Sequence, residues 1–227
     1  MVFAMQGSVQ IVPRLSDGPA VLSSNASRQF VLTNGTGSGQ ANGYHTQTLS
    51  IAAGGSETID LRALAVSVLG ATGTLALASV KQLLVMNLSA KTAVTIAPAV
   101  TDGWANLGGS IPLGAASTLS ITSPVGGIAT SATSKAVTFT NGDTVHSRTG
   151  NTTSGSATLS SLSSTTSLEA GMLVAGTGIP AGATVIAIPT STTVTLSANA
   201  SATGSAVALT FRRPPADVEI HVAGVKV

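Results

Sequence analysis

The segment from Leu168 to Phe211 constrains the fold most, because it places a turn signal after every short apolar or alternating run. An apolar run leads into the loop 176–182, which reads GTGIPAG. Two alternating segments follow, Ala183–Ile188 and Thr192–Leu196. Glycine permits positive φ and proline fixes φ, so a loop that contains both is a tight connection. The segment is therefore predicted to fold as a small all-β unit.

Composition favours β-structure along the whole chain. Charged residues make up 8% of the 227 residues, whereas ordinary soluble domains contain about 25%. Ala, Ser, Thr, Gly and Val dominate the remainder, and small or β-branched side chains suit pleated sheets. The chain has no cysteine, which removes disulfides and thiolate metal sites and fits synthesis in a cytoplasm.

Strand patterns recur along the chain between Gly and Pro punctuation. Gln82–Leu88, QLLVMNL, is apolar on both faces and is predicted to be a central strand. Thr46–Ala52 and Glu57–Leu61 are predicted to form a hairpin around Gly54-Gly55, and Leu61–Leu69 is expected to form a short helix. The other expected strands are Val9–Val12, Arg28–Thr33, Leu75–Ala78, Ala93–Ala97, Thr118–Thr122, Lys135–Thr140 and Asp217–Val222.

Two segments resemble known proteins. The pattern GM.V.GTGIPAG..V......T.VTLS..A.ATG...LTF in 171–211 resembles a small β-module that recurs in structural proteins of tailed bacteriophages. Residues 80–140, with VKQLLVMNLS, a Trp-containing loop and IPLGAASTLSITSPVGG, are similar to compact β-sandwich proteins encoded in phage structural-gene regions. In those proteins the last strand follows soon after the segment matching Lys135–Thr140. Here the candidate last strand, Asp217–Val222, lies far downstream.

This departure predicts an insertion. We expect an all-β chain: a jelly-roll-like β-sandwich with a second small β-module inserted before the last strand. The expected parts are an N-terminal arm at 1–25, a sandwich at 26–146 plus 213–227, and an inserted module at 147–212. Pro214-Pro215 should hold the module at a limited range of angles. The alternative, two tandem sandwiches with Val218–Val222 as a tail strand, stays open.

Charge and hydropathy argue against two classes of partner. The ten Lys and Arg residues are scattered singly except for Arg212-Arg213, and nucleic-acid binding needs clustered cations. Ala63–Val80 is uncharged, but its central glycines and its alternating second half indicate a strand instead of a membrane span. The amino terminus has no positive residue before its short apolar patch, so no cleaved leader is expected.

No constellation for chemistry is apparent. His45, His146 and His221 each lack another titrating residue at motif spacing. Asp217 and Glu219 lie on one face of one predicted strand, whereas glycosidases use carboxylates that oppose each other across a cleft. We therefore expect no enzymatic activity, no cofactor and no metal site.

Four residues are candidates for contacts with partners. Trp104 in its Gly-rich loop is the first candidate anchor, although a loop tryptophan that folds back onto a sheet is at least as common, and Tyr44 beside the glycine loop 35–43 is the second. Arg212 and Arg213 could meet acidic groups of an adjoining chain or form a solvated linker. The resemblance implies a virion structural protein: a capsid decoration (cement) protein on the capsid exterior, made in the host cytoplasm. Its partners would be the major capsid protein and copies of itself, with neither nucleic acid nor membrane. The alternative is a tail or fibre component that contributes to host-surface attachment.

Overall fold

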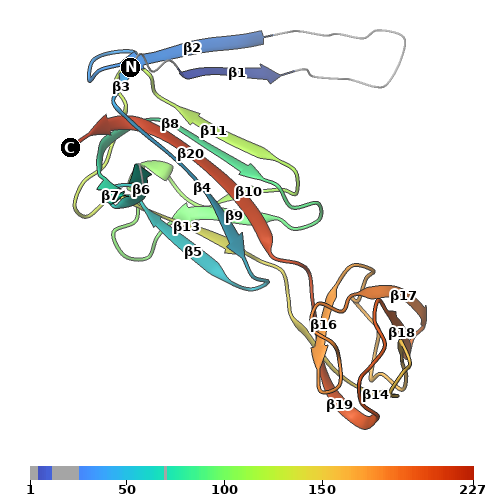
Figure 1. Ribbon diagram of the computed structural model, residues 1–227. Coiled ribbons are helices and arrows are strands. Elements are labelled where there is room, and N and C mark those ends of the chain that lie inside the picture. Colours follow the sequence, from blue (N-terminus) through green and yellow to red (C-terminus); the bar gives the residue numbers. More distant parts are fainter. Residues whose placement is uncertain (1–4, 12–25, 69–70) are drawn as a thin grey trace, which may run out of the picture.

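The computed structural model describes residues 5–11, 26–68 and 71–227, and these residues are built from β-strands (Figure 1). Their one helical element is the 3-10 turn η1 (Ala105–Leu107). A larger body holds two facing sheets, and a smaller body lies at one end of it (Figure 1). The predicted all-β sandwich is confirmed, whereas the strand order does not establish the expected jelly-roll connectivity.

The two facing sheets contain five and four strands. The five-stranded sheet has the order β11 (Thr118–Thr122), β8 (Leu77–Asn87), β20 (Ala216–Lys226) and β4 (Gly43–Ile51), with β12 (Ile128–Ala129) also paired to β8. The four-stranded sheet has the order β10 (Ile111–Leu113), β9 (Val94–Pro98), β13 (Ala136–Asn141) and β5 (Ser56–Asp60). Since β8 lies between β11 and β20, its predicted central position is confirmed.

Alternation along each strand fills the space between these sheets. In β20, Val218, Ile220 and Val222 are fully buried, while Asp217, which directly precedes them, is exposed. This period of two is the expected signature of a strand with one face on a core. The wholly buried rings of Trp104 and Phe139 belong to the same apolar cluster. One continuous core therefore holds both sheets of the sandwich together.

The chain changes sheets at Gly54-Gly55, so the predicted hairpin of Thr46–Ala52 with Glu57–Leu61 is wrong. β4 pairs with β20 in one sheet, and β5 pairs with β13 in the other. Gly54 has a φ of +71°, and a Cβ at Gly55 would lie 2.9 Å from the Ala52 carbonyl oxygen. The two glycines make a tight turn, but the turn connects layers instead of neighbouring strands.

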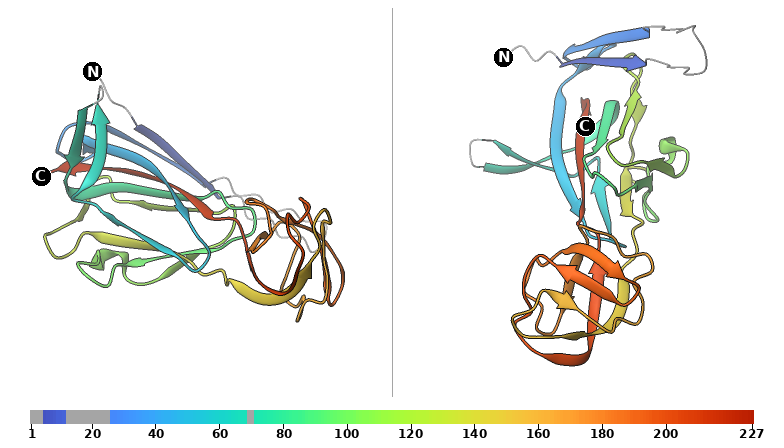
Figure 2. Two further views of the ribbon diagram at one scale, coloured as in Figure 1. Left: turned by 60° about the horizontal axis from the view of Figure 1, so that its bottom comes forward. Right: turned by 90° about the vertical axis from the view of Figure 1, so that its right-hand side faces the viewer.

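The expected short helix at Leu61–Leu69 is also wrong. Its described residues contain β6 (Leu64–Val68), which pairs with β7 (Ala71–Leu75) as a two-stranded ribbon; Leu69 lies outside the described residues. The β-branched residues and alternation prevail over helix propensity here. The ribbon projects sideways from the sandwich (Figure 2). The predicted strand Leu75–Ala78 is divided, because Leu75 ends β7 and β8 begins at Leu77. β8 then runs without a break to Asn87 and includes most of the predicted strand Gln82–Leu88.

The N-terminal segment forms another ribbon. β1 (Met5–Ile11) pairs antiparallel with β2 (Ala26–Asn34) over seven residue pairs, and β2 pairs with the short β3 (Gln40–Ala41). The expected strands Val9–Val12 and Arg28–Thr33 fall mostly within β1 and β2. Val12, Pro13 and the predicted turn at 16–19 lie outside the described residues.

The smaller body contains six strands in two three-stranded sheets. One sheet has the order β14 (His146–Thr152), β19 (Gly204–Arg212), β16 (Leu173–Gly176), and the other has β15 (Thr158–Leu159), β18 (Thr193–Leu196), β17 (Val185–Thr190). Gly176 opens the loop 176–182, and a Cβ there would lie 2.7 Å from the Ala208 carbonyl oxygen. This body has its own apolar cluster, centred on Phe211, Leu209 and Val194.

The strand pairing places the smaller body between the last two strands of the sandwich. β14 to β19 pair only with one another, and β20 then returns to pair with both β4 and β8. Figure 2 shows this body at the end of the sandwich opposite the β1–β2 ribbon. We interpret it as an inserted module, in the sense predicted for 147–212, and call it the module below.

Candidate functional site: the module junction

Two connections join the module to the sandwich. The chain leaves β13 at Asn141 and enters β14 at His146, and it returns from Arg212 through Arg213-Pro214-Pro215 to β20. Because proline fixes φ, the return connection has few accessible conformations. Polar side chains gather around both connections, and they determine how firmly the module is held.

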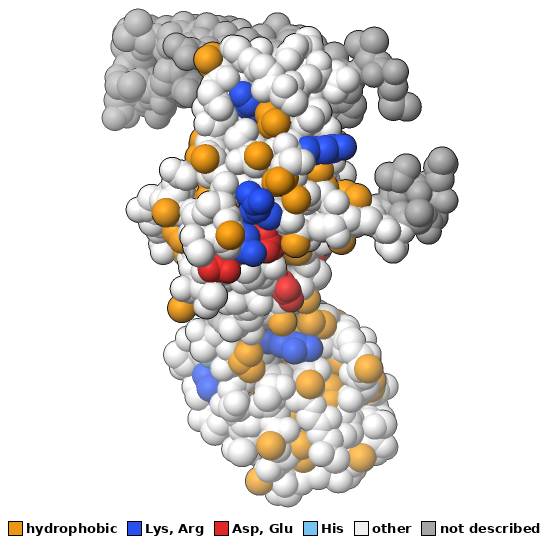
Figure 3. All heavy atoms as spheres, turned by 90° about the vertical axis from the view of Figure 1, so that its left-hand side faces the viewer, with side chains coloured by type: hydrophobic (Ala, Val, Ile, Leu, Met, Phe, Trp, Pro, Cys, Tyr) orange, Lys and Arg blue, Asp and Glu red, His pale blue; other side chains and the backbone are white. Residues whose placement is uncertain are grey.

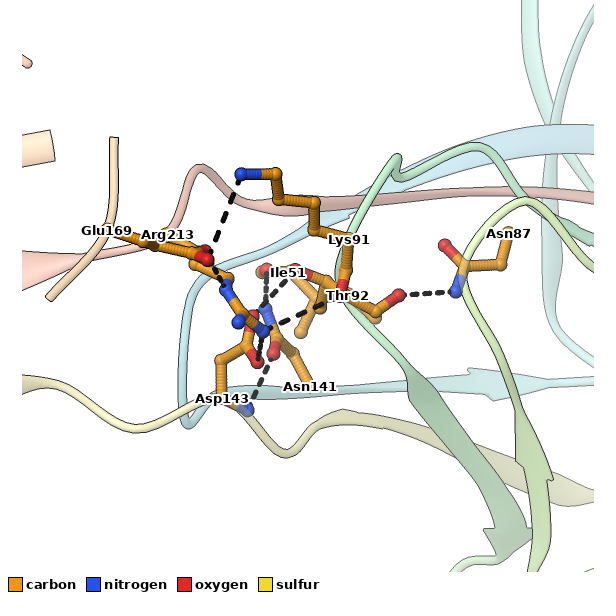
Figure 4. Close-up of polar contacts among 8 residues, drawn as sticks. All are labelled: Ile51, Asn87, Lys91, Thr92, Asn141, Asp143, Glu169 and Arg213. Atoms are coloured by element: carbon orange, nitrogen blue, oxygen red, sulfur yellow. Dashed lines mark hydrogen bonds and ion pairs between the residues drawn. The ribbon is translucent and has the colours of Figure 1, made fainter. Parts of the chain in front are cut away.

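Arg213 is the centre of this cluster (Figure 4). Its Nε donates to Glu169 Oε1 at 2.6 Å, and its Nη1 donates to Asp143 Oδ1 at 2.9 Å. Glu169 belongs to the module, in the loop between β15 and β16, while Asp143 lies on the outgoing connection. The guanidinium therefore ties the return connection both to the module and to the outgoing connection. We call Arg213, Asp143, Glu169 and Lys91 the junction cluster.

The sandwich contributes Lys91 to the junction cluster. Lys91 lies between β8 and β9, and its Nζ is 3.8 Å from Glu169 Oε2 and 3.4 Å from the Ala170 carbonyl oxygen. The neighbouring Thr92 hydroxyl donates to Asp143 Oδ2 at 2.6 Å. One carboxylate of the module thus has basic partners on both the sandwich and the return connection (Figure 4).

Two buried asparagines fix the loops that carry these groups. Asn141 Nδ2 donates to the Ile51 carbonyl, and Asn141 Oδ1 accepts from the Asp143 backbone N–H, both at 2.9 Å. Asn87 Nδ2 donates to the Thr92 carbonyl at 2.7 Å. Both asparagines are almost fully buried, and buried amides with satisfied hydrogen bonds specify one loop conformation.

The ion pairs in the junction cluster change the acidity of its members. The hydrogen bond from Arg213 is the main cause that lowers the pKa of Glu169, and the charges of Arg213 and Lys91 add to it. The same hydrogen bond raises the pKa of Arg213. Both effects favour the charged pair, but about a third of each side chain is exposed, so the contribution to stability is modest. We infer that the cluster acts chiefly by orienting the module.

Three of the four predicted contact residues, Trp104, Arg212 and Arg213, lie in different surroundings in the structure. Trp104 is wholly buried, and its Nε1 donates to the Ala129 carbonyl at 2.9 Å, so it follows the alternative of a loop tryptophan folded back onto the sheet and is not available as an interface anchor. The loop folds back over the core because the indole contributes a large apolar surface to it. Arg213 is committed to the junction cluster, while the adjacent Arg212 is exposed.

Tyr44 and one histidine come together on the outer face of the five-stranded sheet. The Tyr44 hydroxyl lies 2.7 Å from His221 Nδ1, and His221 Nε2 lies 2.9 Å from Glu219 Oε1. His45 is buried and contacts the Gln47 side chain, while His146 lines a hollow of about 370 Å³ at the junction. Among the residues with described positions, no three His, Asp or Glu side chains are grouped so that they could hold a metal ion.

Sequence reasoning missed Asp143, Glu169 and Lys91, together with the two buried asparagines. One signal was present: Glu169 is the only carboxylate in 147–211, a segment otherwise rich in Ser and Thr. Its position beside the paired arginines depends on the long-range return of the chain, which no local pattern reveals.

The comparisons with known proteins give no relative. No family model, curated protein or solved structure matches this chain. Within 5–11, 26–68 and 71–227, no helix is long and apolar enough to cross a bilayer.

Replacement of Arg213 should loosen the module without unfolding either body. Arg213→Gln removes both ion pairs of the guanidinium, whereas Arg212→Gln, at the neighbouring exposed arginine, removes neither. The chain has no native cysteine, so spin labels can be placed cleanly at Val100→Cys in the sandwich and Ile186→Cys in the module, both exposed positions. We expect a wider label-to-label distance distribution for Arg213→Gln and an unchanged one for Arg212→Gln. Equal widths in both variants would show that the cluster does not orient the module.

Proposed function

We propose that this chain is a virion structural protein of a tailed phage, namely a decoration protein on the capsid exterior. In this role it binds the major capsid protein and copies of itself, and the module stands outward or bridges neighbouring subunits. Its function is adhesion, without a catalysed reaction. The resemblance of 171–211 and 80–140 to phage structural proteins suggests the context, and the surface of the module supports the role.

The observation that carries the proposal is the small number of charges on the module. Residues 147–212 contain three charged residues, Arg148, Glu169 and Arg212, and of these Arg212 is exposed at the end of β19. Arg148 donates through Nε and Nη2 to the Ser164 and Thr166 carbonyls at 3.1 and 2.9 Å, and Glu169 belongs to the junction cluster. In the view of Figure 3 the module surface is accordingly almost all uncharged.

A neutral surface suits contacts that repeat on a lattice. Burial of an ionised group carries a large desolvation cost unless a partner compensates it, whereas hydroxyl-bearing and small side chains can be covered at lower cost. Each contact is then weak, but several contacts per molecule act together through their high effective concentration. By limiting the positions of the module, the junction cluster would reduce the entropy lost when it binds.

The test is to compare virus particles with and without this chain. We expect particles that lack it to adsorb to host cells normally but to lose infectivity sooner on heating or osmotic shock. Supply of the purified protein should restore their resistance. Particles that keep their resistance but fail to adsorb would contradict the decoration role and identify a tail or fibre component instead.

A further inference from the structure

Among the described strands, β4 leaves a long sheet edge open. β4 pairs with β20 along one side over nine consecutive residues without a register shift, and it ends the order of its sheet. In the part of the chain that the structure describes, the backbone of Thr46–Ser50 makes no hydrogen bond beyond this ladder. The N–H and C=O groups on the free side can therefore accept a further strand.

The other edges of the sandwich carry protective features that β4 lacks. β10 is three residues long and has Pro112 at its centre. β5 contains Glu57 and Asp60, and β11 is five residues long. Short length, proline and charge are the usual means by which proteins block pairing between edges. β4 has nine residues with no proline, lysine, arginine or carboxylate, so its edge is not protected against pairing.

The exposed face of β4 carries hydroxyl groups at alternate positions. Hydroxyl groups with the same spacing are paired across two other strands of the sandwich. Between β5 and β13, the hydroxyls of Ser56 and Thr140 are 2.9 Å apart, and those of Thr58 and Thr138 are 2.8 Å apart. On β4, the exposed residues Thr46, Thr48 and Ser50 repeat this alternation at an edge that no other described strand faces. Cross-strand hydroxyl pairs of this kind stabilise antiparallel sheets.

We propose that two copies of this chain pair through β4, antiparallel about a two-fold axis at Thr48. In this register Thr48 faces Thr48 of the second copy, and Thr46 faces its Ser50, so the three hydroxyls on each strand gain partners. The contact is self-complementary and uncharged. It also closes on itself, since a two-fold pairing uses the open edge of both copies and leaves none for further growth.

A groove beside β4 provides room for the end of the second strand. It measures about 840 Å³ and is lined by Tyr44, His45 and Thr46 of β4 together with Val66 and Thr74 of the β6–β7 ribbon. With the axis at Thr48, the segment that follows Ser50 in the second copy runs into this groove. That segment is Ile51 followed by the small turn Ala52-Ala53-Gly54-Gly55, whose side chains are small enough to enter. The proposal concerns the free protein and does not depend on the proposed function.

Disulfide formation tests the register directly, because the chain has no cysteine of its own. Residues that face each other across antiparallel strands have Cβ atoms about 4.5–5.5 Å apart, close to the spacing of a disulfide. Thr118 is a matched control: the pairs Thr48–Glu219, Glu219–Met86 and Met86–Thr118 place it in the same cross-strand row, at the opposite edge. On mild oxidation we expect Thr48→Cys to form covalent dimers at least about tenfold faster than Thr118→Cys, because pairing raises the effective thiol concentration.

A charge substitution gives a second readout that needs no covalent bond. Thr48→Glu would place two new carboxylates beside the two copies of Glu219 in one row, so we expect a monomer by light scattering, while Thr118→Glu keeps the dimer. Circular dichroism checks that both variants are folded. A monomeric wild-type chain from micromolar to millimolar concentration overturns the proposal. A dimer that is insensitive to Thr48→Glu, or equal cross-linking at the two cysteines, also overturns it.

Discussion

Trp104→Ala is expected to lower the free energy of unfolding of the sandwich by about 3–5 kcal/mol and to leave the module unchanged. The indole is wholly buried in the cluster that joins both sheets, and its removal leaves a large cavity. The hydrogen bond to the Ala129 carbonyl is lost as well, although Asn106 Nδ2 also donates to that oxygen at 3.1 Å. Most of the effect therefore comes from packing. Calorimetry of the full chain should show separate unfolding transitions for the sandwich and the module, and the substitution should lower the temperature of the sandwich transition alone.

Two controls separate packing from other effects of this substitution. Trp104→Phe retains most of the buried ring and should cost less than the alanine variant. Val100→Ala, at a nearby position that is fully exposed, should leave stability within about 0.5 kcal/mol of the wild type. If Trp104→Ala proved as stable as the wild type, the tryptophan would not be a core residue. It would then again be a candidate for an interface anchor.

Phe211→Ala should destabilise the module and leave the sandwich unchanged. Phe211 is wholly buried in the second apolar cluster, where it pairs across the sheet with Val174 on β16. Loss of the ring should lower the free energy of unfolding of the module by about 3–5 kcal/mol. Because the chain has a single tryptophan, which lies in the sandwich, unfolding followed by Trp104 fluorescence should be unchanged, while calorimetry should show the module melting earlier.

The two substitutions together test whether 147–212 folds as a separate unit. Ile186→Ala, at a half-exposed position of the module, is the matched control and should shift neither transition appreciably. If Phe211→Ala lowered the fluorescence transition as much as the calorimetric one, sandwich and module would unfold as one cooperative unit. The interpretation as an independent insertion would then fail.

Local patterns predicted most strands because alternation is read directly from neighbouring residues. The segments Thr118–Thr122 and Asp217–Val222 fall within β11 and β20. The errors occurred where long-range packing decides. Gly54-Gly55 has the chemistry of a hairpin turn, but β5 finds its partner in β13, some 80 residues later in the chain. Likewise, the sequence near Trp104 left open whether its loop presents the indole to a partner or folds it onto the core.

The junction cluster was the least predictable feature, because its members come from four separate segments. Lys91, Asp143, Glu169 and Arg213 converge only once β20 has returned to the sheet. The sequence predicted a restricted connection through Pro214-Pro215, and it gave Arg212 and Arg213 together as residues that could contact an adjoining chain or form a solvated linker. Which carboxylates it meets follows from the positions of β13 and the module loop, and these positions depend on the whole fold.

The most direct test of the decoration role is the number of copies of this chain per particle, measured by quantitative mass spectrometry of purified virions. A protein that covers a shell through many weak, uncharged contacts should be present at a fixed ratio to the major capsid protein, with a copy number of the same order. A few copies per particle, in proportion to the tail proteins, or none at all, would contradict the account.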